Sequence, residues 1–361
     1  MLPHLRRWQA VAAVWVCVSV PVIASPPIED IRQLLIAHLP QAPDAAALHA
    51  LSGADFNAAL RAIDPHARYF PAQDLRPPAL GQATGIGAVL VMRDNAIELI
   101  PYQGSPLDRA GLPERVILYA IDGQTVAHER DEQRIANRLR GTPGSPVTLW
   151  VVSLDWQQSW TVELHREPYK ALDVEVIRLG ERAVLRIHQF VAGLTRSALR
   201  ASIDFLERDT EPVIIDLRDA LGGDLYEALD TAALFLPKGT PLGVLHRYGG
   251  QSDPFQAPFD NPLSVPLIIL VGPDTASAAE VFAGILQQHG RAQLMGRPTF
   301  GKCSTQTEIR LSNGGVLRLT NGEVELPNAT ACPLQGLRPD ILVPEADIHT
   351  LETLLPYVPA G

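Results

Sequence analysis

Ser277 lies where an apolar run gives way to a second apolar segment, across a Gly-Pro-Asp turn. The run 266–271 is typical of a buried strand, and the segment 281–286 is typical of a helix. Several hydrolases keep a nucleophilic serine at such a strand-to-helix turn. Ser277 lacks the glycines two places to either side that mark a nucleophile elbow, and no histidine stands near it in the sequence. If Ser277 is a nucleophile, its proton must go to another kind of base.

Lys302 is the candidate base, 25 residues after Ser277 (302 − 277). A lysine accepts a proton only when its pKa has fallen from ~10.4, and a dry setting formed by Phe300 and the neighbouring apolar strands is expected to lower it. On one extended strand Lys302 and Gln306 share a face, so the uncharged carboxamide of Gln306 can orient the amine. The residues alone leave open that Lys302 is a solvated surface charge.

A glycine pair, Gly222-Gly223, follows a strand-like segment at 213–217 and precedes a helix-like one. Backbone amides in such a turn can hold a developing oxyanion, whereas the alternative is a tight turn that needs glycine only for positive φ. Glu280, one helical turn after Ser277, is expected to be a structural hydrogen-bonding residue rather than a base. The loops do not match phosphate-loop spacing, and His66 and His289 are expected at the surface without metal-ligand spacing, so neither a cofactor nor a metal is predicted.

Hydrophobic periodicity divides the chain into three parts. Residues 27–63 carry helical spacing, short alternating strands run from about 84 to 165, and beyond 166 strands and helices alternate. The expected fold is therefore a multidomain α+β or α/β protein, with a short helical N-terminal segment (25–80), a β-rich domain (81–165) and an α/β core with a mixed sheet (166–361).

The first 24 residues have the pattern of an export signal, with Arg6 and Arg7 before an apolar run at 8–20 that is too short to span a bilayer. Export to the periplasm is predicted, with membrane contact only during transit. The whole chain carries a net charge of −10 from 30 basic and 40 acidic residues, and loss of the two arginines gives 28 − 40 = −12. This charge and the absence of a basic tract argue against nucleic acid as a partner. Cys303 and Cys332 can pair in an oxidising compartment, or stay buried free thiols.

The motifs together resemble those of the C-terminal processing peptidases, also called tail-specific proteases. The resemblance runs from about residue 64 to 343 and spreads over many ordered motifs. These are Asp64-Pro-His-Ala-Arg-Tyr69, Gly85-Ile86-Gly87, Ser105-Pro-Leu-Asp-Arg-Ala-Gly111, Ile121-Asp-Gly123, Leu139-Arg-Gly141, Asp216-Leu-Arg218 with Gly222-Gly223, Thr275-Ala-Ser-Ala-Ala-Glu280, Thr299-Phe-Gly-Lys302 with Gln306, and Gly336-Leu-Arg-Pro-Asp340.

The resemblance implies a PDZ domain at 81–165 followed by a serine protease core with a Ser-Lys dyad at 166–361, and with the export signal the leading hypothesis is an exported serine endopeptidase. Ser277 matches the family nucleophile, Lys302 its general base and Gln306 the side chain that orients the lysine. The amides of Ala278 and of Gly222 or Gly223 match the oxyanion hole. Gly85-Ile86-Gly87 matches the loop that receives the C-terminal carboxylate of a protein or peptide substrate, beside a strand open to β-augmentation.

Three departures from the family pattern bear on activity. Glu114-Arg115-Val116 replaces a Gly-Asp turn, Cys303 replaces a glycine after the lysine, and the loop before the glycine pair reads Asp219-Ala-Leu. An altered 219–221 loop could displace the oxyanion amides. The alternative function is therefore a peptide-binding adaptor of weak or lost catalytic activity on the same fold. A regulatory partner and a homo-oligomer are left open.

Overall fold

The computed structural model describes residues 26–359, except 53–54, 73–74, 76–82, 94–95, 103, 130, 170–173, 180–181, 207–211, 328–329 and 332–334. The predicted export signal and Cys332 lie outside these residues. Within them, no helix is both long enough and apolar enough to cross a membrane.

The N-terminal part is helical, as predicted, and packs on the far end of a long hairpin. Its elements are α1 (Ile28–His38), α2 (Ala45–Ala50), α3 (Phe56–Ile63) and the short strand β1 (Arg68–Phe70). Asp44 and Asp55 accept hydrogen bonds from the first turns of α2 and α3, which fixes where these helices begin. Ile31 and Leu35 of α1 are fully buried in one apolar cluster with Leu317 and Leu319 of the hairpin.

Residues 83–169 form a β-rich unit, here called the β module, with an apolar core of its own. Its strands are joined in the antiparallel order β3-β4-β5-β7-β8, so β3 is an edge strand, and α4 contacts β3. The elements are β2 (Ala83–Gly85), β3 (Ala88–Met92), β4 (Ile97–Pro101), η2 (Asp108–Ala110), β5 (Val116–Ile121), β6 (Gln124–Thr125), α4 (Glu132–Leu139), β7 (Pro146–Val152), β8 (Ser159–His165) and β9 (Glu167–Tyr169).

The core contains a mixed sheet of order β10-β11-β12-β15-β16-β20, in which β10 and β11 are antiparallel and the other neighbours are parallel. This confirms the α/β core with a mixed sheet. Its elements are β10 (Val174–Leu179), β11 (Arg182–Ile187), α5 (Thr195–Leu206), β12 (Val213–Asp216), α6 (Leu225–Ala232), η3 (Ala233–Phe235), β15 (Leu267–Val271), α7 (Ala278–Gln288), β16 (Gln293–Gly296) and β20 (Ile341–Leu342), followed by η5 (Glu345–Asp347), α8 (Leu351–Leu354) and η6 (Leu355–Tyr357).

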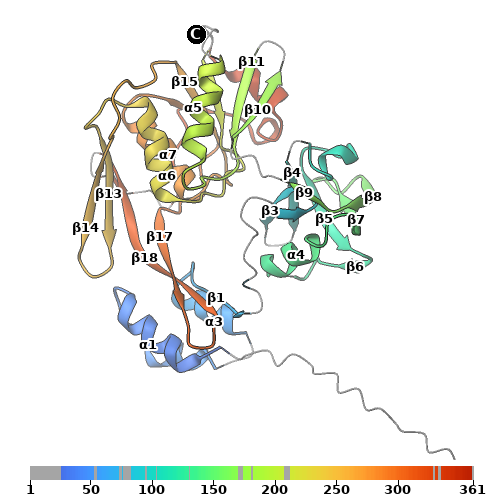
Figure 1. Ribbon diagram of the computed structural model, residues 1–361, viewed down its shortest axis with the longest axis vertical. Helices are drawn as coiled ribbons and strands as arrows, with labels where there is room; N and C mark the ends of the chain where they lie inside the picture. Colours follow the sequence, from blue (N-terminus) through green and yellow to red (C-terminus); the bar gives the residue numbers. More distant parts are fainter. Residues whose placement is uncertain are drawn as a thin grey trace, which may run out of the picture.

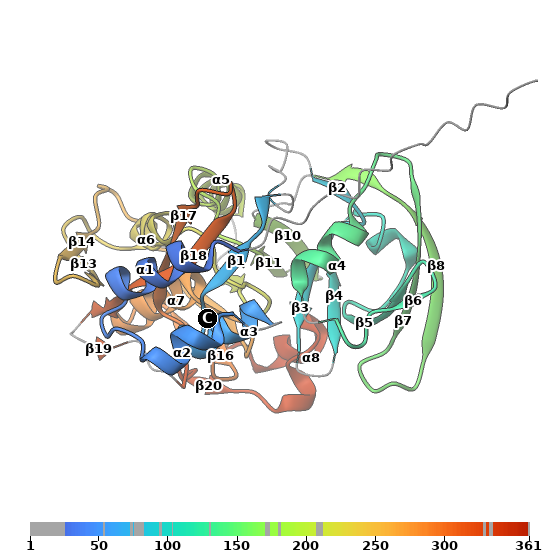
Figure 2. The ribbon, with the colours of Figure 1, turned by 90° about the horizontal axis from the view of Figure 1, so that it is seen from below.

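A second sheet connects the core to the N-terminal helices. It comprises β13 (Pro241–Arg247), β14 (Ser252–Gln256), β17 (Ser304–Arg310), β18 (Val316–Leu326), β19 (Thr330–Ala331) and β1. Figure 1 shows the β17–β18 hairpin reaching from beside α6 and α7 down to β1 and α3, with the β module to one side of the core. Seen from below, α4 and β3 of the module face the rest of the molecule (Figure 2). The hairpin therefore extends from the segment that carries Lys302 to the N-terminal part.

Candidate active site

Ser277 occupies a strained turn between β15 and α7. Its backbone has φ 57° and ψ −123°, one of four positive φ values at non-glycine positions among the described residues. Such a conformation is costly and persists only where the surroundings enforce it. Thr275 provides part of that support, because its buried hydroxyl donates to Leu217 O at 2.8 Å and accepts from Gly272 N at 2.9 Å. The serine is thus held rigidly at the N-terminus of a helix.

Gly222 permits the close approach that elbow glycines provide in other hydrolases. A Cβ atom on Gly222, whose φ is +112°, would lie 2.8 Å from Ser277 Cβ and 3.2 Å from Ala278 N. A side chain cannot fit there without moving the serine turn. Gly222, which belongs to another loop, thus provides the space that the serine turn needs.

The amides expected to form an oxyanion hole are without partners among the described residues. Ala278 N belongs to the first residue of α7, where a helix leaves its amides unpaired. In the second loop Phe190 N donates to Gly222 O at 2.9 Å and Asp224 N donates to Phe190 O at 2.8 Å, so the loop is held through groups other than the amides of Gly222 and Gly223. The amides near Ser277 are available to an anionic oxygen.

Glu280 joins the serine turn to the lysine segment. Its side chain is fully buried and accepts from Ser277 N at 2.9 Å, Gly301 N at 2.6 Å and Lys302 N at 2.7 Å. Thr299 Oγ1 donates to it as well, at 2.5 Å. Three of these four contacts hold backbone amides and the fourth holds a threonine hydroxyl, which agrees with the structural role expected for Glu280. One carboxylate thus sets the distance between the two candidate catalytic positions.

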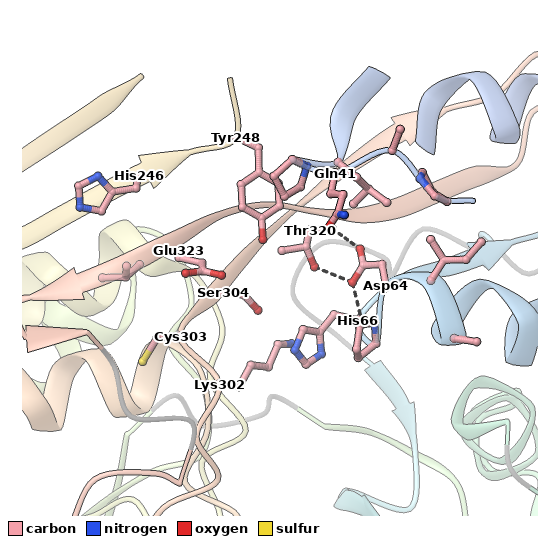
Figure 3. Close-up of a pocket in the computed structure, with 18 of the residues that line it drawn as sticks. Gln41, Asp64, His66, His246, Tyr248, Lys302, Cys303, Ser304, Thr320 and Glu323 are labelled. Carbon is pink, nitrogen blue, oxygen red and sulfur yellow. Dashed lines mark hydrogen bonds between the residues drawn. The ribbon is translucent and has the colours of Figure 1, made fainter. Parts of the chain in front are cut away.

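Lys302 is half-buried, and its pKa is lowered. Burial is the largest cause because it disfavours the ammonium, and the charge of Arg318 acts in the same direction; the carboxylates of Asp64 and Glu280 oppose them. Among the described residues no hydrogen bond joins Lys302 Nζ to Ser277. Figure 3 shows the Lys302 side chain extending towards His66 instead.

Three details near Lys302 differ from expectation. Phe300 does not shield the amine, since it is 59% exposed. Lys302 precedes β17 rather than lying on it, and the register shifts between Thr305 and Gln306, so the simple alternation that placed Lys302 and Gln306 on one face fails. The carboxamide of Gln306 donates to Ser304 O and Oγ, both at 3.0 Å, and not to the lysine.

A cavity of about 520 Å³ nevertheless brings the candidate catalytic residues together. Ser277, Ala278, Gly223, Lys302 and Gln306 all line it. Part of its wall is apolar and includes Leu221, Leu225, Tyr226, Leu245 and Val281. A polypeptide could therefore meet the serine, the free amides and the lysine in one place.

A larger cavity of about 890 Å³ lies between the N-terminal segment and the hairpin, and Lys302 and His66 both line it. His66 was expected at the surface, without metal-ligand spacing. The structure instead places it half-buried beside the candidate base. The missed signal was the motif Asp64-Pro65-His66, in which the carboxylate accepts from His66 N at 3.0 Å and orients the turn.

Cys303, next to the lysine, is disulfide-bonded. Cys332, the partner expected from the sequence, lies outside the described residues, so this pairing stays a prediction.

In the β module, the loop Gly85-Ile86-Gly87 is fixed through its carbonyls. Leu107 N donates to Ile86 O and Tyr102 N donates to Gly87 O, both at 3.0 Å. Within the described part of the chain the amides of Ile86 and Gly87 have no partner. Gly87 has φ +69°, and a Cβ there would lie 2.4 Å from Ser105 Cβ. The loop thus presents free amides beside the open edge of β3.

Charged side chains join the β module to the core close to the serine turn. Arg93 makes two bonds to Asp274, at 2.6 and 2.5 Å. Arg115 contacts Glu98 at 2.9 Å, Asp274 at 3.2 Å, and also Asp219. Two of the departures from the family pattern, at positions 115 and 219, are therefore partners in one network.

A strained serine, free amides and a lysine of lowered pKa in one cavity are the components of a serine hydrolase. Residues 181–343 match the model of peptidase family S41. The chain is 31% identical over 297 residues to the carboxy-terminal-processing protease of Bartonella bacilliformis, covering 80% of this chain and 68% of that protein. It is also 31% identical over 292 residues to the carboxyl-terminal-processing protease of a Synechocystis species, covering 78% and 68%.

Solved structures show the same fold. The photosystem II D1 C-terminal processing protease superposes with a TM-score of 0.68 at 21% identity, covering 91% of this chain and 95% of that one. A putative S41 protease from Bacteroides fragilis superposes with a TM-score of 0.56 at 16% identity, covering 99% and 95%. The chain belongs to the carboxy-terminal-processing protease family, and it is a serine peptidase.

Proposed function

We propose that the protein is an exported serine endopeptidase that captures protein C-termini or unfolded segments and cleaves them with a Ser277-Lys302 dyad. The observation that carries the proposal is the Glu280 carboxylate, which holds both positions through their backbone amides beside one cavity. A lowered lysine pKa supports it, because a lysine base must be neutral to act.

The reaction proceeds through an acyl-enzyme. Neutral Lys302 turns towards Ser277 and takes its proton as Oγ attacks the peptide carbonyl. The amides of Ala278 and of Gly222 or Gly223 donate to the oxyanion. The ammonium then gives its proton to the leaving amine, and a water molecule repeats the sequence on the ester. Gln306 orients the amine once it has turned to the serine. No cofactor takes part.

Substrate capture is assigned to the β module, acting as a PDZ domain. In the loop Gly85-Ile86-Gly87 the free amides of Ile86 and Gly87 receive a terminal carboxylate, and the chain that follows adds to the edge of β3. This mode of capture uses main-chain groups of the substrate, so it suits many protein sequences. The substrates are proteins or peptides met after export, in the periplasm.

Labelling with a serine-reactive phosphonate, together with cleavage of an unfolded protein, tests the proposal. The wild type should be labelled at Ser277 and should cleave, whereas Ser277→Ala and Lys302→Ala should do neither. Proteolysis that survives Ser277→Ala would disprove the dyad. One observation supports the alternative, a peptide-binding adaptor: among the described residues no hydrogen bond joins Lys302 to Ser277. If the protein is an adaptor, the wild type should stay unlabelled and should still bind C-terminal peptides.

A further inference from the structure

The cavity between the N-terminal segment and the hairpin contains the free end of Lys302, and the nearest titratable group that Figure 3 shows there is His66. The two interact, since the charge of Lys302 lowers the pKa of His66, after burial as the larger cause. Burial and the charged lysine thus both favour the neutral form of the His66 imidazole.

The Asp64 carboxylate, whose charge raises the pKa of Lys302 against the effect of burial, is held in place by three hydrogen bonds. Thr320 N and Thr320 Oγ1 each donate to it at 2.8 Å, and His66 N donates at 3.0 Å. These three bonds satisfy the buried acid and fix the turn that carries the imidazole (Figure 3). One turn thus holds the Asp64 carboxylate in place and brings the imidazole of His66 next to Lys302.

We propose that His66 is a positioning residue for the lysine base: its imidazole covers one side of the resting Lys302 amine and takes the place of water there. This inference rests on the proposed Ser-Lys mechanism. It gives a role to the motif Asp64-Pro65-His66, which the reaction itself does not use. The N-terminal segment therefore takes part in tuning the base, although it lies outside the protease core in the sequence.

The other charged groups around His66 and Lys302 do not cover the Lys302 amine in this way. Glu280 and Arg318 act on Lys302 with opposite signs. The remaining wall carries groups that are engaged with one another or with backbone, namely His246 with Glu325 at 3.1 Å, Tyr248 with Glu323, and Asp44 with Ala47 N at 2.7 Å.

The test is the rate of phosphonate labelling of Ser277 against pH in the full chain. In His66→Ala, water enters over the amine and the ammonium is less disfavoured, so the pKa of Lys302 rises. The rising limb of the curve of labelling rate against pH should therefore move to higher pH. Labelling should be about threefold slower at neutral pH, and the maximal rate at high pH should be unchanged. His66→Phe keeps the cover without a titrating group and should stay near the wild type.

His246→Ala is the matched control, because it removes a histidine from the same cavity at a distance from Lys302 (Figure 3); its limb should not move. An unmoved limb in His66→Ala, or a rate lowered equally at every pH, overturns the inference. So does a His66→Phe limb that moves as far as that of His66→Ala.

A second measurement does not need catalysis. Ser277→Ala protein is treated with an amine-reactive reagent at a series of pH values, and modification of Lys302 is followed by mass spectrometry. The rate of modification reports the neutral fraction of Lys302 directly. Adding His66→Ala should shift that profile to higher pH, and an unchanged profile contradicts the role. If Lys302→Ala is labelled at Ser277 like the wild type, the dyad itself is wrong; if that variant is inert and the His66 profiles do not move, only the positioning role fails.

Discussion

Arg115 donates a hydrogen bond from Nη2 to the carboxylate of Asp219, which joins the β module to the loop that leads into Gly222-Gly223. Both side chains are largely buried, at 16% and 12% exposure. Removing either side chain leaves the other as an unpaired buried charge. The effects of the two residues on the free energy of unfolding are therefore expected to be coupled.

Arg115→Ala should lower the free energy of unfolding by about 1 to 3 kcal/mol and slow phosphonate labelling of Ser277. Loss of the pair frees the loop that holds the amides proposed to bind the oxyanion. A double-mutant cycle with Asp219→Ala should show a coupling of about 1 kcal/mol. Arg109→Ala removes an exposed ion pair with Glu167 in the same module and serves as the control. Additive effects of the Arg115 and Asp219 changes would argue against the coupling.

Lys302→Met should stabilise the protein at neutral pH. The pKa of Lys302 in the folded state lies below its ordinary value of 10.5, so folding disfavours the ammonium and this penalty is present at every pH below the folded pKa. As pH rises from the folded pKa to the unfolded pKa the penalty disappears, so the gain from Lys302→Met should shrink over that window. Thermal unfolding of both proteins against pH measures this. Lys238→Met, at an exposed ion pair, should show no such trend.

Glu280→Gln should destabilise the protein by about 2 to 4 kcal/mol and abolish labelling of Ser277. An amide group brings two donors to a site where Ser277 N, Gly301 N, Lys302 N and Thr299 all donate. Denaturant unfolding and labelling check the two effects. Asp260→Asn, at an exposed ion pair, is the control. A stable, fully labelled Glu280→Gln protein would show that the carboxylate does not position the site.

Gly222→Ala should slow phosphonate labelling by about 10²-fold or more. The added methyl group would lie 2.8 Å from Ser277 Cβ, and φ +112° is unfavourable for alanine, so the serine turn or the loop that carries Gly222 must shift. Gly239→Ala also places alanine at a positive φ, +82°, but its added methyl group meets no atom within 4 Å. Equal labelling of the two variants would mean that backbone strain, and not the contact with Ser277, accounts for the loss.

Local sequence patterns were enough to predict the main architecture. Apolar periodicity placed α7 and β15 on either side of Ser277, and the alternation beyond residue 166 gave the mixed sheet. The β13–β14 hairpin was not foreseen, because Pro254 weakens the strand pattern and is tolerated only at the edge position that β14 occupies.

The residues of the candidate site could be proposed from the sequence, but their arrangement in space could not. The elbow-like turn at Ser277 depends on Gly222, 55 residues earlier (277 − 222), and such a contact has no signature in the local sequence. The bulge between Thr305 and Gln306 is likewise set by pairing with β18. His66 was missed because its significance comes from a cavity formed by distant segments.

The bonds from Glu280 to positions 277 and 302 are made to main-chain amides, so they do not depend on the side chains at those positions. A chain that carries alanine at 277 should therefore keep the shape of its cavity while losing the ability to form an ester. Such a chain would retain bound clients instead of releasing their fragments. Recovered from cells with its cargo, it would serve as bait for identifying the proteins that this peptidase processes.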